Sequence, residues 1–162
     1  MAAKGSPAMT VTMPTDREVA ITRVFDAPRR LVFETWTSPE HLPHWMLGPE
    51  GWTMPVCEID LRPGGSWHCE WRRTNGAAMG MRGVYREIKP PERLVSTESW
   101  GGDWPETLNT LVLTEADGKT TMTLTILYPS KEARDAALQT GMKEGVAASF
   151  NRLAEYMGKM KN

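Results

Sequence analysis

The polar residues that could do chemistry lie in the middle of the chain, on segments that alternate polar and apolar side chains. Glu98 would share a strand face with Trp100, and Asn109 with the apolar residues of its own strand, so both could point inward. Together with Tyr85 and Tyr128 they would offer polar contacts to a ligand. No Ser-His-Asp or Cys-His arrangement occurs at a recognisable spacing, so we predict no catalytic residue.

Histidine and cysteine residues point only weakly to metal binding. His41 and His44 are three residues apart on a short expected helix, with a proline between them and no evident third ligand. Cys57 and Cys69 lie on neighbouring expected strands, but alternation places His68 on the opposite face. We therefore interpret both cysteines as small buried apolar groups and expect no metal site. No phosphate-binding glycine motif occurs, so no cofactor is predicted.

The charge balance excludes several classes of partner. Nineteen basic and 20 acidic side chains give a net charge near −1, without the basic excess of a nucleic-acid-binding or membrane-surface protein. The longest uncharged apolar run is far shorter than the roughly 18 residues that a bilayer span needs. No secretory signal follows Lys4, and two cysteines cannot form a disulfide framework. These features predict a cytoplasmic protein of one domain, with no membrane span and no nucleic-acid partner.

Tryptophan and methionine are unusually frequent. The chain has seven Trp against three Tyr and three Phe, and it has 11 Met. All seven Trp lie between residues 36 and 104. Wide, flat or flexible side chains either line an irregular space or fill a Trp-rich core, and composition leaves both interpretations open.

The hydrophobic pattern predicts one domain over residues 17–158, between a disordered tail over 1–16 and a short tail over 159–162. A strand over 17–25 leads into two short helices, with Asp26 capping the first and Trp36 and Trp45 on their apolar sides. Six strands joined by short turns follow, as an antiparallel meander whose apolar face needs a cover. The apolar set expected on that face is Cys57, Ile59, Leu61, Trp67, Cys69, Trp71, Met122, Leu124, Ile126 and Tyr128.

The expected cover is a single helix of about 28 residues from Ser130 to Met157, with apolar residues three and four apart. Gly141 and Gly145 would lie in its interior, where each glycine costs about 1 kcal/mol relative to alanine. The row of small residues that they form either leaves room for a ligand, or lets the helix approach the sheet closely or kink.

The order of these elements and a series of local motifs resemble one known superfamily. The motifs are Phe25-Asp26-Ala27-Pro28, Trp36-Thr37-Ser38-Pro39-Glu40, Trp45 with Gly48-Pro49, Asp60-Leu61-Arg62-Pro63-Gly64-Gly65, Gly83-Val84-Tyr85-Arg86-Glu87-Ile88, Pro91-Glu92-Arg93-Leu94, and Gly141-Met142 through Ser149-Phe150 to Leu153. In this order they resemble the SRPBCC or START-like superfamily, which has the birch-pollen-allergen fold. Within it, the chain is similar to homologues of the activator of heat-shock protein 90 ATPase. Met46 stands where many of those relatives carry a second Trp.

The resemblance implies an α+β helix-grip fold. In this fold a curved antiparallel sheet, made of one N-terminal strand and the six-stranded meander, wraps around a long C-terminal helix. Relatives bind lipids, sterols, polyketides or plant hormones in a cavity between helix and sheet, and a few catalyse cyclisation or related chemistry. We therefore expect a protein that binds a small hydrophobic molecule, lipid-like or aromatic and polyketide-like, and that is not an enzyme.

Two alternatives and one question of assembly are left open. The first alternative is a cyclase- or hydrolase-type enzyme that uses the same cavity. The second is a chaperone-associated interaction protein with a role in stress response. Homodimer formation is neither predicted nor excluded. The residues expected to bind the ligand are Trp36, Trp45, Ile59, Trp67, Trp71, Tyr85, Glu98, Trp100, Asn109, Leu124, Tyr128, Gly141, Met142, Gly145 and Phe150.

Overall fold

Alternating apolar residues form eight strands within the residues that the computed structural model describes, 9–101 and 104–160. The strands are β1 (Thr10–Thr12), β2 (Glu18–Phe25), β3 (Trp52–Ile59), β4 (Ser66–Arg73), β5 (Ala78–Lys89), β6 (Arg93–Glu98), β7 (Thr107–Ala116) and β8 (Lys119–Leu127). They form one antiparallel sheet in the order β1-β2-β8-β7-β6-β5-β4-β3. The six-stranded meander predicted from the sequence is therefore present, and β2 extends it beyond β8.

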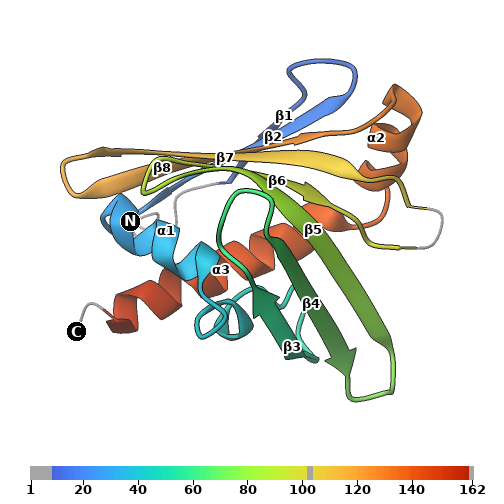
Figure 1. Cartoon of the computed structure of the whole chain (residues 1–162), viewed down its shortest axis with the longest axis horizontal. Helices are drawn as coiled ribbons and strands as arrows, with labels where there is room; N and C mark the ends of the chain where they lie inside the picture. Colours follow the sequence, from blue (N-terminus) through green and yellow to red (C-terminus); the bar gives the residue numbers. More distant parts are fainter. Residues whose placement is uncertain (1–8, 102–103, 161–162) are drawn as a thin grey trace, which may run out of the picture.

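The helices lie on one side of this sheet. They are α1 (Arg29–Thr37), the single 3-10 turn Leu42–His44, α2 (Lys131–Leu138) and α3 (Met142–Met160). In Figure 1, α3 runs beneath β7 and β8 and passes behind β4 and β5, so the curved sheet covers it, as in the predicted helix-grip fold. No helix within the described ranges is long and apolar enough to span a membrane.

The prediction of a single C-terminal helix is wrong, because the helix is interrupted between Leu138 and Met142. Ser130 caps α2 as expected, since its hydroxyl accepts a hydrogen bond from the Ala133 N–H at 3.1 Å. Gly141 separates the two helices with a φ of 83°, a left-handed conformation that ends a helix and favours glycine. Gly141 is therefore not in a helix interior, whereas Gly145 is. The apolar spacing continues across the break, so periodicity alone did not reveal it.

Three expectations for the first part of the chain also need correction. Thr10–Thr12 pairs with β2, so part of the expected tail over 1–16 is an edge strand; residues 1–8 lie outside the described residues. Pro28, not Asp26, occupies the N-cap of α1, and no side chain caps that helix. The second short helix is only one 3-10 turn that ends before Trp45.

Two smaller corrections concern an inner-face residue and the C-terminus. Leu61 was expected on the inner face of the sheet, but it follows the end of β3 and is exposed. Helix α3 continues to Met160, so residues 159 and 160 of the expected short tail are helical, and residues 161–162 lie outside the described residues.

The solid core lies at the C-terminal half of α3. Phe150, Leu153 and Met157 are buried there, and the Phe150 ring meets the Phe25 ring of β2 edge-on at a centroid distance of 6.2 Å. Trp45 is fully buried, and its indole N–H donates to the Thr35 carbonyl at 3.0 Å, which fixes the 3-10 turn against α1. This packing fixes the second half of α3. The first half of the helix lines a cavity instead.

Candidate functional site

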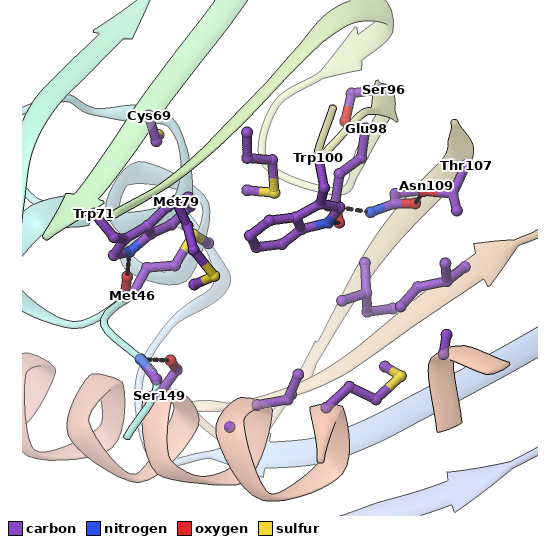
Figure 2. A pocket seen from close by; sticks show the side chains of 18 of the residues that line it. Met46, Cys69, Trp71, Met79, Ser96, Glu98, Trp100, Thr107, Asn109 and Ser149 are labelled. Carbon is purple, nitrogen blue, oxygen red and sulfur yellow. Dashed lines mark hydrogen bonds between the residues drawn. The ribbon is translucent and has the colours of Figure 1, made fainter. Parts of the chain in front are cut away.

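A cavity of about 500 Å³ lies against the first half of α3. Its walls come from α2, α3, the loop after the 3-10 turn and the inner face of strands β3–β8. Figure 2 shows side chains from the sheet and from α3 pointing into this common space. Protein interiors leave few voids larger than a water molecule, so a space of this size is not a packing defect.

Strand β4 shows how the sequence directs side chains into the cavity. Trp67, Cys69 and Trp71 are buried and line it. His68 and Glu70 alternate with them on the other face, where their side chains approach to 3.1 Å. The alternation predicted from the sequence is therefore correct for this strand.

All seven tryptophans border this one cavity. All seven therefore border an irregular space, and Trp45 is at the same time part of the buried core. They come from α1, the loop after the 3-10 turn, β3, β4 and the segment between β6 and β7. The indole N–H of Trp71 donates to the Met46 carbonyl at 2.7 Å, which ties the sheet to that loop (Figure 2).

The small residues of α3 lie against the cavity and against the loop that carries Gly48 and Pro49, not against the sheet as one of the two interpretations had it. The hydroxyl of Ser149 accepts a hydrogen bond from the Gly48 N–H at 2.8 Å, so the loop lies close against the helix (Figure 2). A Cβ added at Gly145 would meet Pro49 Cδ at 3.8 Å, an ordinary van der Waals contact. Both Gly145 and Ser149 also line the cavity. Gly145 and Ser149 therefore allow the loop to approach the helix closely, and their small side chains fill little of the cavity.

A polar group of side chains occupies the end of the cavity formed by β6 and β7. The two oxygens of Glu98 each accept one hydrogen bond at 2.7 Å, from Trp100 Nε1 and from Asn109 Nδ2. The Thr107 hydroxyl in turn donates to Asn109 Oδ1 at 2.8 Å. Ser96 lies opposite Asn109 in the strand register and also lines the cavity. Figure 2 shows this group beside the indole of Trp100.

The apolar surroundings change the acidity of the ionisable groups here. Burial raises the pKa of Glu98, and the hydrogen bonds from Trp100 and Asn109 oppose that rise. Burial also raises the pKa of Tyr128 to about 12, and the charge of Glu98 adds to the effect. Burial raises the pKa of Tyr85 as well. The two tyrosines are therefore neutral hydroxyl groups at physiological pH.

The two cysteines differ: Cys69 is buried as expected, whereas Cys57 is only partly buried, and the hydrogen bond from Cys69 lowers the pKa of the Cys57 thiol. Cys57 and Cys69 are cross-strand partners with their sulfur atoms 4.0 Å apart, and both are free. Cys69 lines the cavity, and its hydrogen bond to Cys57 together with burial raises the pKa of its thiol. Because the thiolate is the nucleophile, the cavity-lining thiol of Cys69, which is held neutral in this way, is a poor nucleophile.

His41 and His44 pack against Tyr156. The His41 Nδ1 lies 2.7 Å from the Tyr156 hydroxyl, and the His44 ring stacks on the Tyr156 ring with centroids 5.1 Å apart. Within the described residues, no group of three or more His, Cys, Asp or Glu side chains is placed to hold a metal ion.

All 15 residues predicted for ligand binding line this cavity. Their position is thus established, and their contact with a ligand stays a prediction. Sequence reasoning missed other lining residues, among them Met46, Leu47, Trp52, Met79, Met81, Ser96, Trp104 and Thr107. The high Trp and Met content was the signal that could have identified most of these.

The chain matches a known family model and several solved structures. The family model described as "Activator of Hsp90 ATPase homolog 1-like protein" matches residues 26–158. A crystal structure from Rhodobacter sphaeroides is 27% identical, covers 93% of this chain and 98% of its own, and superposes with a TM-score of 0.89. A crystal structure from Mycobacterium smegmatis is 25% identical, with coverage of 92% and 96% and a TM-score of 0.81.

More distant structures share the fold alone. The AHSA1 protein from Silicibacter pomeroyi is 21% identical, covers 88% of this chain and 99% of its own, and has a TM-score of 0.71. No curated protein matches the chain.

Proposed function

The chain belongs to the family of activator of Hsp90 ATPase homolog 1-like proteins, and we propose that it binds a small hydrophobic molecule in the cavity between its helices and its sheet. Proteins of this fold family commonly bind hydrophobic ligands. We further propose that the 15 lining residues predicted from the sequence contact the ligand, and that binding takes place in the cytoplasm.

The single observation that carries the proposal is the cavity of about 500 Å³ bordered by every tryptophan of the chain. Small-molecule sites are typically clefts of roughly 300–1,000 Å³, lined by apolar and aromatic side chains with a few placed polar groups. The lining fits this description, because most of it is apolar or aromatic and one group of polar side chains lies at one end around Glu98 and Asn109.

An enzyme that uses the same cavity is the weaker proposal. Glu98 is an acid with a raised pKa, a property that general acids often have. However, the side chains that hold it are the amide of Asn109 and the indole of Trp100, and neither accepts or releases protons at physiological pH. The described lining residues include no second carboxyl group and no His, Lys or Arg, and the lining tyrosines are neutral at physiological pH, so the site favours binding over acid–base chemistry.

Native mass spectrometry of freshly purified protein is the direct test. We expect a retained molecule, or stabilisation by members of a panel of fatty acids, flavonoids, sterols and aromatic polyketides. Binding to the folded state alone stabilises it by about 2.7 kcal/mol when free ligand is 100 times its dissociation constant. For a domain of this size that corresponds to a rise in Tm of roughly 5–10 °C. Protein that carries nothing and responds to no member of the panel would refute the proposal, in favour of a protein that acts through its surface.

A further inference from the structure

The polar end of the cavity contains one carboxyl group and no positive charge. Among the described residues that line the cavity, Glu98 is the one Asp or Glu, and no Lys, Arg or His lines it. Glu98 also forms no ion pair within 4.0 Å in the part of the chain that the structure describes. An ionised carboxylate in apolar surroundings is unfavourable unless it is paired.

The hydrogen bonds around Glu98 fit the ionised form of this carboxyl. Trp100 Nε1 can only donate, and it donates to Oε2. The Thr107 hydroxyl donates to Asn109 Oδ1 and so turns the Asn109 amide nitrogen toward Oε1. Both carboxyl oxygens therefore face donors, and each keeps a lone pair for one more.

The surroundings of these oxygens suit a positively charged group. The donors that already reach Glu98 are neutral: the N–H edge of the Trp100 indole, whose ring stacks on Trp71, and the Asn109 amide. A charged donor that reaches the carboxylate would form a charge-assisted hydrogen bond, which is roughly twice as strong as a neutral one. It would also supply the counter-charge that the cavity lining lacks.

We infer that the cavity selects apolar molecules that carry a primary or secondary amine, with the ammonium group bound to Glu98 and the apolar body against the tryptophans. This inference rests on the proposed function and narrows its ligand class. Glu98 acts in it as the specificity-determining residue, and Asn109 and Thr107 orient its carboxylate.

A matched ligand series tests the inference. Naphthylethylamine, naphthylethanol and naphthylacetate share one aromatic body and differ in the charge of the head group. Their dissociation constants are measured by calorimetry at neutral pH. We expect the amine to bind about tenfold or more tighter than the alcohol, as a hydrogen bond between charged groups predicts, and the carboxylate to bind weakest.

The variant Glu98→Gln keeps the shape of the side chain and removes its charge. We expect it to bind the amine no tighter than the alcohol, because its neutral amide offers the ammonium group no opposite charge. Glu106→Gln is the matched control, because Glu106 is an exposed glutamate that precedes β7 and does not line the cavity. It should keep the full preference for the amine.

A measurement on the unmodified protein covers the case in which Glu98→Gln does not fold. The ratio of amine to alcohol affinity should fall as the pH is lowered and Glu98 takes up a proton. The other ionisable groups whose pKa responds to its charge, Tyr128 and Cys69, stay neutral throughout that range. Naphthylethylamine stays protonated, so the change reports on Glu98.

The outcomes separate the two proposals. Equal affinity for amine and alcohol, a preference that survives Glu98→Gln, or a ratio that does not change with pH would each overturn the inference and leave ligand binding in the cavity standing. Failure of all three compounds to bind, together with no retained molecule in native mass spectrometry, would overturn both.

Discussion

The indole rings of Trp71 and Trp100 stack with centroids 5.5 Å apart and planes 19° from parallel. Each ring is also held by its N–H group, which donates to the Met46 carbonyl in one case and to the Glu98 carboxylate in the other, both at 2.7 Å. The pair thus links the loop after the 3-10 turn, strand β4 and the polar end of the cavity. Both rings line the cavity, and these contacts hold them in place. A ligand there would therefore change the surroundings of an indole whose position stays the same.

The first prediction is that apolar ligands change the intrinsic Trp fluorescence and raise the Tm together. The fluorescence changes because the ligand replaces water or empty space beside indole rings. The Tm rises because the ligand binds the folded state alone. Both signals are measured across one ligand titration and should give the same dissociation constant.

Trp71→Phe is the variant that identifies the reporting ring. It removes the indole that stacks on Trp100 and should reduce the fluorescence change while leaving the shift in Tm largely intact. A fluorescence change without any shift in Tm would instead indicate adsorption to the surface.

The second prediction concerns Gly145→Leu, which should abolish ligand binding without lowering the Tm. Gly145 is in the interior of α3, and a Cβ there makes only an ordinary contact with Pro49. The larger side chain gains up to about 1 kcal/mol of helix propensity. It occupies the cavity instead of a filled core, so the usual overpacking cost of about 1–3 kcal/mol should not appear.

Gly158→Leu is the matched control for this variant. Gly158 lies in the same helix, is exposed, and would place a Cβ with nothing within 4 Å. It should gain similar helix propensity and retain ligand binding. Gly141 is unsuitable for such a test, because its φ of 83° would strain a leucine whatever space the cavity offers. A marked drop in the Tm of Gly145→Leu would contradict an open cavity at this position.

A feature could be predicted from the sequence where neighbouring residues along the chain carried its signal, and could not where it depended on backbone angles or on a distant partner strand. The inner face of β4 was predictable because Trp67, Cys69 and Trp71 alternate strictly with polar residues. The break at Gly141 was not, since the apolar spacing of the helix continues across it and only the backbone angle distinguishes a helical glycine from a terminal one. The short edge strand β1 depends on its partner Thr22 and its neighbours in β2, and three residues of sequence carry no such information.

The candidate site follows the same pattern. Glu98 and Asn109 were predicted to face inward from their strand positions alone. Their direct hydrogen bond was not predictable, because it depends on the register that sets Glu98 opposite Thr107 and Ser96 opposite Asn109. Met79 and Met81 were missed because no alternation of the surrounding residues marked which face they occupy.

The third prediction is that Gly83→Ala destabilises the protein by about 2 kcal/mol or more, through steric overlap inside the sheet. A Cβ at this position of β5 would overlap the Thr97 carbonyl oxygen and would lie 2.6 Å from Trp67 Nε1. The first of these is backbone and cannot move aside. Chemical denaturation measures the free energy of unfolding of both proteins.

Gly80→Ala on the same strand is its control. A Cβ there would meet the Cys69 carbonyl oxygen at 3.9 Å and Glu70 Cγ at 4.0 Å, both ordinary contacts. The free energy of unfolding should change by about 0.5 kcal/mol or less. Similar losses in the two variants would show that the contacts of Gly83 with Thr97 and Trp67 are not what limits the substitution.

The last prediction is the pH dependence of stability that Glu98 introduces. Its pKa in the folded protein lies above the ordinary value of 4.5, so between these two values the folded state binds more protons than the unfolded state. Stability therefore falls as the pH rises through that window, and the penalty disappears below it.

Glu98→Gln carries no such pH-dependent penalty. Other carboxyl groups also titrate there, and the difference in Tm between the variant and the unmodified protein largely cancels their contributions. The variant also loses one of the two hydrogen bonds that Glu98 accepts, because its amide has a single acceptor oxygen, and this loss is the same at every pH. We therefore expect the Tm of the variant, relative to that of the unmodified protein, to increase as the pH rises from 4.5 toward neutrality. Thermal melts of both proteins across this range measure it. A difference that stays constant with pH would mean that the pKa of Glu98 is not raised by folding, and the cavity would then already supply the charge compensation that an amine ligand is proposed to bring.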